Sequence, residues 1–241
     1  MQEKISIVIP TYNEINNIPK LLIKIQHSME KITPNYEILI VDDNSPDGTG
    51  KFVEKISETN KKIRAIIRKE KTGLGDAYKY GFQFVTGDII FSMDADLSHN
   101  PDDFPKFLKG LKYGDVVVGS RYIKGGGHIN CDKRRIIISK VANILASFFF
   151  HLHLTDCTSG FRVYRKKVID TIMPYVNCQK YTFLVEMLEN ATRFNFKISE
   201  VPIYFRDRVE DESKFNISEV LEFLKVLLRK ILLIDKAKRK K

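Results

Sequence analysis

Cysteines are few in this 241-residue chain, and long apolar runs are absent. Cys131, Cys157 and Cys178 are widely spaced and form no CxxC pair, which favours reduced thiols in a cytosolic protein over a disulfide framework. No stretch reaches the roughly 18–20 uncharged apolar residues that a membrane-spanning helix needs. A charged stretch and then a strand pattern follow Met1 directly, so no signal peptide is expected.

Several common motifs of nucleotide-binding proteins and hydrolases are also missing. The chain has neither a Walker A motif nor a GxGxxG motif, so a P-loop ATPase and a dinucleotide-binding fold are not supported. No GxSxG nucleophile elbow occurs. The spacing typical of a zinc site with cysteine is not seen for His99, His128, His151 or His153.

The net charge of +10 points toward anionic partners, which include phosphates, nucleic acids and anionic membrane surfaces. Much of the excess lies in a basic C-terminal tail that contains Lys236, Lys238, Arg239, Lys240 and Lys241. Because the charge is concentrated there and no recognition motif is present, nucleic-acid binding is not expected. The apolar fraction of 43% and the charged fraction of 29% fit a soluble globular protein.

Short apolar runs alternate with helical patterns in the first part of the chain. The strand candidates are residues 5–10, 36–41, 63–67 and 88–92. The helix candidates between them are residues 17–29, 49–59 and 73–84. This alternation predicts an α/β fold with a mostly parallel, doubly wound sheet flanked by helices. In such sheets, ligands bind beyond the carboxyl ends of the strands.

The second part of the chain continues with less regular patterns. Strands are expected at residues 115–119, within 156–166 and at 199–205, where Pro202 suggests an edge or bulge, and helices at 102–111 and 180–191. Three glycines mark residues 120–127 as a mobile loop. Residues 134–154 predict either a buried helix or a helix that lies on a membrane or partner and exposes Phe148, Phe149 and Phe150.

The simplest domain assignment is one main α/β domain over residues 1–215 and an amphipathic helix with a basic tail over residues 216–241. Within that tail region, residues 217–234 are strongly helical and carry a narrow polar stripe. The helix could pack on the core with two of its sides. It could equally lie in a bilayer interface with the basic tail on the headgroups.

The strand candidate at 88–92 runs directly into two carboxylates, Asp94 and Asp96. Carboxylates this close resist ionising together unless a cation meets them. Mg²⁺ or Mn²⁺ would do so, since such ions are typically held by one or two carboxylates and by substrate phosphates. The alternative is a surface turn in which the aspartates cap the following helix.

Polar loops follow two other strand candidates. Asp42 and Asp43 could cap a helix or accept hydrogen bonds from the base or ribose of a nucleotide. Tyr12 could stack on a base, and Glu14 could bind ribose hydroxyls. Because the carboxyl ends of parallel strands share one edge of a sheet, these loops and Asp94–Asp96 should converge on one crevice.

Seven segments occur in one order: IPTYNE, VDDNSPDGT, GLGDAYKYG, MDADLSH, GSRY, TSGFRVYR and VPIYFRDRVEDESK. With this combination, the chain resembles family 2 glycosyltransferases of the GT-A fold, over about residues 4–230. It is most similar to the polyprenol (dolichol) phosphate mannose synthase group. The resemblance implies a C-terminal helix that docks on a membrane surface or on a small membrane-anchoring subunit, at the cytoplasmic face.

The resemblance also implies roles for individual residues. Nucleotide-sugar binding would involve Pro10, Tyr12, Glu14, Val41, Asp43, Asp94, Ala95, Asp96, Arg121 and Arg208. Mg²⁺ or Mn²⁺ would be held by Asp94 and Asp96, with Ser98 as a weak third ligand where some relatives have glutamine. The catalytic residues would be Asp96, Arg121 and Arg208, and the acceptor phosphate would meet Arg135 and Lys214.

The implied reaction moves mannose from GDP-mannose to a polyprenyl (dolichyl) phosphate. A phosphate monoester has a second pKa of about 6, so this acceptor is largely dianionic at neutral pH and needs no strong general base. A single in-line displacement with inversion would give a β-linked mannosyl phosphate lipid. Three alternatives stay open: a polyprenyl-phosphate glucosyltransferase that uses UDP-glucose, an enzyme that extends a polysaccharide, and a non-catalytic nucleotide- or lipid-binding subunit.

Overall fold

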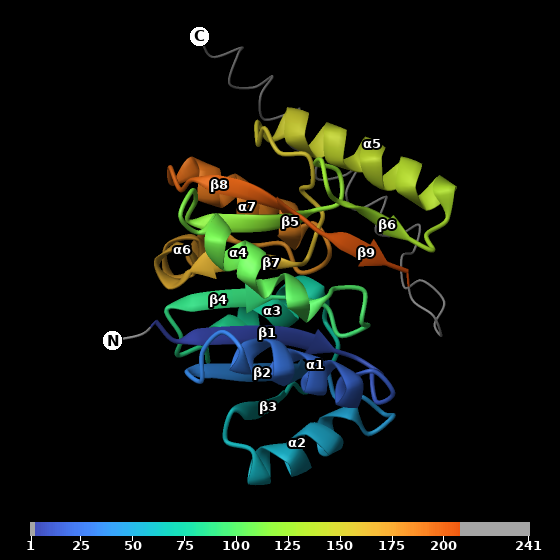
Figure 1. Ribbon diagram of the computed structural model, residues 1–241, viewed down its shortest axis with the longest axis vertical. Coiled ribbons are helices and arrows are strands. Elements are labelled where there is room, and N and C mark those ends of the chain that lie inside the picture. Colours follow the sequence, from blue (N-terminus) through green and yellow to red (C-terminus); the bar gives the residue numbers. More distant parts are fainter. Residues whose placement is uncertain (1–2, 208–241) are drawn as a thin grey trace.

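The computed structural model describes residues 3–207 and is built around a seven-stranded sheet with the strand order β3-β2-β1-β4-β7-β5-β8 (Figure 1). Strands β6 and β9 form a second, two-stranded sheet. Arg208, Lys214 and the predicted C-terminal helix with its basic tail lie outside the described residues. Within the described residues, no helix combines the length and the hydropathy that crossing a bilayer requires.

The first half of the sheet follows the sequence prediction closely. Its parallel strands are β1 (Ile5–Thr11), β2 (Tyr36–Asp42), β3 (Ile63–Ile67) and β4 (Ile89–Ser92). The helices between them are α1 (Ile18–Glu30), α2 (Thr49–Thr59) and α3 (Leu74–Phe82). Every residue of β2 is buried, as expected for a strand covered by helices on both faces. The predicted α/β fold with a mostly parallel sheet is confirmed.

The second half of the sheet departs from a purely parallel arrangement. Strand β7 (Arg162–Arg165) runs antiparallel between β4 and β5 (Val116–Ser120), and β8 (Ile198–Pro202) pairs in parallel with β5 at the edge. The edge position predicted from Pro202 is confirmed. The single strand predicted at residues 199–205 is wrong, because the chain changes sheets at Ile203. It continues as β9 (Tyr204–Arg206), which pairs with β6 (Gly127–Ile129).

The helices of the second half cover both faces of the sheet. They are α4 (Phe104–Gly110), α5 (Lys133–Phe149), α6 (Lys166–Ile172) and α7 (Phe183–Arg193). Short 3-10 turns at Pro101–Asp103 and Met173–Tyr175 precede α4 and follow α6. Helix α6 was not predicted, because it begins directly after β7 and its seven residues are too short for a clear helical period.

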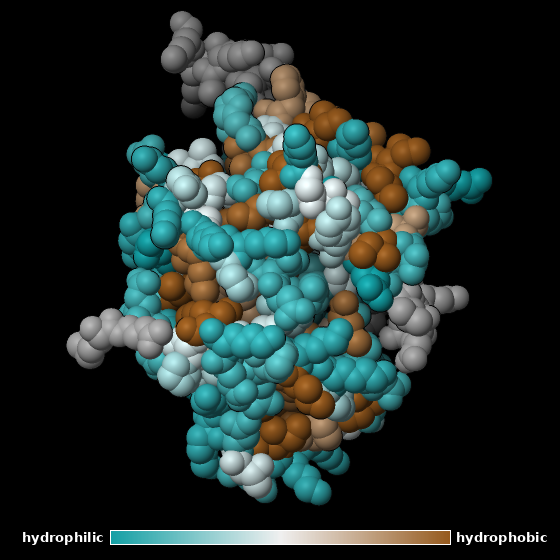
Figure 2. Space-filling model, viewed as in Figure 1, coloured by the Kyte–Doolittle hydropathy of each residue, from teal (hydrophilic) through white to brown (hydrophobic). Residues whose placement is uncertain are grey.

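Helix α5 combines features of both predictions made for it. Its buried residues are Asn143 and Ala146, whereas an exposed apolar stripe comprises Ile137, Ile138, Val141, Ile144 and Phe148, each 50–71% exposed. Apolar side chains gather along this helix in Figure 2. The expectation that three consecutive phenylalanines are exposed is wrong, since Phe150 is buried and the helix ends at Phe149. We define the five exposed residues as the α5 stripe.

Strand β7 carries a fully buried arginine, Arg162, at the centre of the sheet. Its guanidinium donates to the carbonyl oxygens of Ser159, Leu184 and Cys157 at 2.7, 2.6 and 2.8 Å. A buried cation is tolerable only when its donors are satisfied in this way. Arg162 therefore fastens the loop before β7 and the first turn of α7 to the sheet.

We predict that Arg162→Met lowers the free energy of unfolding by about 3–5 kcal/mol, because it strands three buried carbonyl groups. The matched control is Arg165→Met on the same strand, where the arginine makes a partly exposed ion pair with Glu3 at 3.3 Å. That change should cost less than about 1 kcal/mol. Urea denaturation measures both, and equal losses would contradict the prediction.

Candidate active site

The loops after β1 and β2 are joined to each other at the carboxyl edge of the sheet. Asp42 accepts hydrogen bonds from the hydroxyls of Thr11 and Ser45 at 2.8 and 2.6 Å and from the Ser45 amide at 2.8 Å. The amide of Asn13 in turn donates to the Ser45 hydroxyl at 3.0 Å. Asp42 is thus occupied by contacts within the fold, and it holds the two loops in one arrangement.

The neighbouring acid, Asp43, has a different environment. Arg68, just beyond β3, donates from Nη1 to Asp43 Oδ1 at 2.7 Å. The pKa of Asp43 is raised to about 6, because burial and the charge of Asp42 raise it by more than the charges of Arg68 and Lys71 lower it. The carboxylate is therefore ionised at neutral pH but titrates close to it. The residue pattern alone left both acids open, and the family resemblance named Asp43. Both missed Arg68, whose position one strand further along gives no local signal.

The other residues predicted to hold the nucleotide lie at this same edge. Lys71 Nζ sits 4.1 Å from the centroid of the Tyr12 ring. Glu14 is buried at the start of α1 and accepts from the side chain of Asn17 at 2.8 Å. Pro10 and Val41 are paired in register on β1 and β2. The structure thus brings Tyr12 and Asp43 together with the basic segment 68–71.

The loop after β4 contains Asp94 and Asp96 in a tightly bent backbone. Asp96 Oδ1 accepts a hydrogen bond from the Ser98 amide at 3.0 Å, and Leu97 between them has a φ of +63°. A positive φ is unusual for leucine and persists only where the surroundings enforce it. Here the carbonyl of Ser98 accepts from the Arg206 amide of β9 at 3.2 Å. We call residues 94–98 the acidic loop.

The acidic loop does not cap the following helix, which was the alternative for these aspartates. That function falls to Asn100, whose side chain accepts from the Asp102 amide at 3.2 Å. Asp94 keeps a partly exposed side chain, while Asp96 is mostly buried. A capping role therefore does not explain why two acids lie at this point.

The side chains of the acidic loop fit a hard divalent cation. The hydroxyl of Ser98 is buried and has no hydrogen-bond partner within residues 3–207. An orphaned hydroxyl oxygen in the same loop as two carboxylates is a ligand of the type that Mg²⁺ and Mn²⁺ prefer. Across the described part of the chain, no three His, Cys, Asp or Glu side chains gather as a possible metal site. Two carboxylates and a hydroxyl suit an ion that substrate phosphates also coordinate.

His99 belongs to the same site, although sequence reasoning considered it only as a zinc ligand. The Asp94 amide donates to its Nδ1 at 3.1 Å, and its Nε2 lies 3.8 Å from Asp94 Oδ2. Because Nδ1 is an acceptor, the proton of the neutral ring is on Nε2 and faces the carboxylate. The ring stacks on Phe161 with centroids 4.9 Å apart. His99 therefore helps to orient Asp94.

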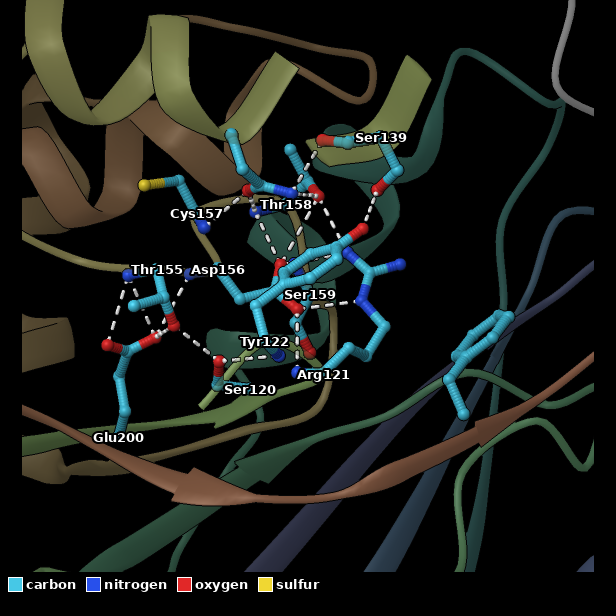
Figure 3. Close-up of polar contacts among 12 residues, drawn as sticks. Ser120, Arg121, Tyr122, Ser139, Thr155, Asp156, Cys157, Thr158, Ser159 and Glu200 are labelled. Atoms are coloured by element: carbon cyan, nitrogen blue, oxygen red, sulfur yellow. Dashed lines mark hydrogen bonds and ion pairs between the residues drawn. The ribbon is translucent and has the colours of Figure 1, made fainter. Parts of the chain in front are cut away.

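Arg121, at the end of β5, makes a two-pronged ion pair with Asp156 (Figure 3). Arg121 Nε and Nη2 donate to the two carboxylate oxygens at 2.7 and 2.8 Å, and Nη2 also donates to the Thr158 hydroxyl at 2.8 Å. Asp156 has no exposed surface. Burial opposes its ionisation, but Arg121 lowers the pKa of Asp156 below its ordinary value. Sequence reasoning had missed this partner of Arg121.

The loop that carries Asp156 also reaches the acidic loop. The carbonyl of Gly160 accepts from the Ser92 hydroxyl at 2.9 Å. A Cβ atom added to Gly160 would lie 3.1 Å from Asp94 Oδ1, so the backbone there forms a close wall beside the carboxylate. Arg135 on α5 pairs with Asp207 at 2.7 Å, next to the predicted phosphate ligand Arg208. The loop that carries Asp156 and the acidic loop therefore lie against each other.

Comparisons with known proteins identify the family to which the chain belongs. Residues 6–173 match the family described as Glycosyl transferase family 2. The chain is 35% identical over 222 residues to polyprenol monophosphomannose synthase of Mycolicibacterium smegmatis. The aligned residues cover 90% of this chain and 82% of the relative. It is also 35% identical over 213 residues to undecaprenyl-phosphate mannosyltransferase of Micrococcus luteus, with coverages of 87% and 86%.

Among solved structures, the fold is similar to that of glucosyl-3-phosphoglycerate synthase from Mycobacterium tuberculosis, crystallised with Mn²⁺, UDP and phosphoglyceric acid. The TM-score is 0.69 at 17% identity, over 95% of this chain and 78% of the other. This likeness supports the GT-A fold predicted from the sequence. Since the family match spans well over half of the chain and the two relatives cover most of it, the protein belongs to glycosyl transferase family 2.

Proposed function

We propose that this protein transfers mannose from GDP-mannose to a polyprenyl phosphate. One observation carries the proposal. The acidic loop lies against the loop that orients Arg121, at the edge where Tyr12 and Asp43 meet a basic segment. Transfer from a sugar nucleotide needs three binding regions: one for the base, one for the diphosphate and one for the acceptor. The mannosyltransferase names of both relatives support the choice of sugar and of lipid acceptor.

On the nucleotide side, Asp43 is the residue suited to read the base. Its carboxylate is ionised at neutral pH and can accept hydrogen bonds from the N–H groups of guanine. Tyr12 offers a ring for stacking, and Glu14 offers a carboxylate for ribose hydroxyls. Pro10, Val41 and Ala95 would complete the wall of the nucleotide site.

On the diphosphate side, Asp94 and Asp96 would hold Mg²⁺ or Mn²⁺, with Ser98 as the third protein ligand. When bound, such an ion stabilises the charge that develops on the leaving diphosphate. His99 holds the backbone of Asp94 through its amide, and the Ser98 amide holds the carboxylate of Asp96. This arrangement spares the site from reorganising its charged groups during the reaction.

On the acceptor side, the chain supplies arginines rather than a base. Nη1 of Arg121 donates to no group within residues 3–207, so it can meet a phosphate oxygen. Arg135 lies nearby, and Arg208 and Lys214 are further candidates outside the described residues. The acceptor phosphate oxygen attacks the anomeric carbon as the bond to the diphosphate breaks and GDP leaves. No proton is transferred, and inversion gives a β-mannosyl phosphate lipid.

The lipid acceptor requires contact with a bilayer, and the α5 stripe is the surface suited to it. Lys133, Arg134 and Lys140 are exposed on the same helix. An apolar stripe flanked by basic side chains matches an anionic membrane surface. The proposed location is therefore the cytoplasmic face of a membrane, where a small membrane-anchoring subunit could assist.

The reaction is tested with purified protein, a short polyprenyl phosphate and Mg²⁺ or Mn²⁺. GDP-mannose should give a mannosyl lipid, and UDP-glucose should compete poorly. Asp96→Ala should lower the rate at least about 100-fold, because it removes a main source of stabilisation for the leaving group. Asp170→Asn, an exposed acid on α6, should leave the rate unchanged. Transfer by Asp96→Ala after removal of metal would refute the proposal.

Binding of GDP-mannose should weaken by about tenfold as the pH falls through about 6, because protonated Asp43 loses its charge-assisted hydrogen bonds to the base. Above that pH the carboxylate is ionised and binding is tight. In Asp43→Asn, the affinity should stay at the low-pH level throughout. Glu58→Gln, exposed on α2, should keep the wild-type titration. Calorimetric titrations between about pH 5 and pH 8 measure this, and an unaltered profile in Asp43→Asn would exclude the role.

Replacing Ile137 and Ile144 by serine should reduce co-sedimentation with anionic phospholipid vesicles several-fold, because both side chains are exposed members of the α5 stripe. Ile23 on α1 is a matched control, since it is 69% exposed but lies outside the stripe. Ile23→Ser should bind vesicles as the wild type does. Equal effects at the two places would argue against a specific membrane face.

A further inference from the structure

Helix α5 is attached to the site mainly by polar side chains. Of its residues, Asn143 and Ala146 are buried. Tyr122, next to Arg121, donates from its hydroxyl to the Ser139 hydroxyl at 2.8 Å. The Arg135–Asp207 ion pair forms a second link. The apolar contacts of α5 with the core lie toward its C-terminal end, at Leu145, Ala146 and Phe149. The rest of the helix therefore depends on these polar links for its position relative to the loops of the site.

Asn143 makes the most complete of these links. Its Oδ1 accepts from the amides of Cys157 and Thr158 at 2.6 and 3.1 Å. Its Nδ2 donates to the Thr158 hydroxyl at 3.1 Å and to the Ser139 carbonyl of its own helix at 2.9 Å. Both acceptor sites and both donors of the amide are used, so its orientation is unique and a flipped amide would lose the contacts.

The segment that Asn143 holds, residues 157–160, connects the surroundings of Arg121 with those of Asp94. The Thr158 hydroxyl accepts hydrogen bonds from both Asn143 Nδ2 and Arg121 Nη2. The Thr158 amide lies 3.3 Å from Asp156 Oδ1 (Figure 3). Two residues later, Gly160 forms the wall beside Asp94. A displacement of α5 would therefore act on Arg121 and on the Asp94 wall through one short segment, residues 157–160.

The opposite side of α5 carries the stripe. Val141 and Ile144, which flank Asn143 closely in sequence, are 51% and 60% exposed, whereas Asn143 is 2% exposed. Asn143 thus faces the site from a helix whose outer face is apolar and flanked by basic residues. The surface suited to lipid and the residue that holds the loop therefore lie on opposite sides of the same turn of the helix.

We propose that Asn143 is a positioning residue that couples the membrane-facing helix α5 to Arg121 and Asp94 through residues 157–160. This inference rests on the proposed function, in which the stripe meets the bilayer and Arg121 meets a phosphate. Seating α5 on the membrane holds the segment in the orientation described here. Without the side-chain amide of Asn143, the seating of α5 on the membrane no longer fixes the orientation of residues 157–160.

The test is amide hydrogen exchange of the peptide that covers residues 155–161, with and without anionic phospholipid vesicles that contain no acceptor. In the wild type, vesicles should slow this exchange by a factor within the roughly 5- to 150-fold range of typical coupling between sites. In Asn143→Ala, the slowing should fall below about twofold although the protein still co-sediments with vesicles. A merely structural role would speed exchange equally in both conditions.

Asn190→Ala is the matched control. Asn190 is also buried on a helix and also donates to the carbonyl four residues earlier, at 3.0 Å, but its other contact is Tyr175 rather than the site. It should show the wild-type response to vesicles. Should Asn143→Ala fail to fold, Asn143→Asp takes its place. It keeps an acceptor for the two amides and loses the donors to Thr158, so its response should be smaller than that of the wild type.

Two results would overturn the inference: a full vesicle response in the Asn143 variants, or no response in a wild-type protein that binds the vesicles. Neither depends on sugar transfer. Absence of mannosyl transfer in a protein that shows the exchange response would instead refute the proposed function alone. In a protein active in transfer, Asn143→Ala should lower kcat for the vesicle-borne acceptor at least about tenfold, with the KM for GDP-mannose changed less than about threefold.

Discussion

The buried carboxylate of Asp156 is the constraint on which the site depends. A carboxylate with no exposed surface must be matched by charge and by hydrogen bonds, and Arg121 supplies both through two parallel contacts. The backbone around Asp156 is also held by hydrogen bonds. Glu200 of β8 accepts from the amides of Thr155 and Asp156, and Arg162 binds carbonyl groups of the same loop. The loop therefore has one conformation, and Arg121 is oriented before any substrate arrives.

The acidic loop shows a second form of preorganisation, in which strain is maintained by distant contacts. Leu97 adopts a positive φ so that the Ser98 amide can turn back onto Asp96. That turn is supported by β9, whose Arg206 amide binds the Ser98 carbonyl. Strand β9 exists because the chain leaves the main sheet at Ile203 and joins β6. The change of sheet that made the prediction of a single strand wrong is thus the feature that supports the acidic loop, where we propose that the metal is held.

The same contrast explains which parts of the fold and of the site could be predicted. Continuous apolar runs placed β1 to β4 within a residue or two, because buried parallel strands need them along their whole length. The polar residues that follow these runs lie in loops at the ends of β1, β2 and β4, as expected, and their roles in binding remain predictions. Their partners were not visible, since Arg68, His99 and Asp156 take part through side-chain contacts that local patterns do not record. Of the two acids after β2, the family resemblance named Asp43, and the fold supplied the physical difference: Asp42 is tied into the loops, whereas Asp43 pairs with Arg68.

By itself, the sequence determined an α/β fold, the strand ends that bear the polar loops and, through its motifs, membership of a glycosyltransferase family. These features depend on local periodicity and on short motifs, which sequence order preserves. Only the tertiary structure decided that β7 runs antiparallel, that Arg121 is paired with Asp156, and that Asn143 joins an exposed apolar helix to the site. Each of these depends on the burial of charged or polar groups, and the partners that satisfy them come from distant segments that the sheet brings together.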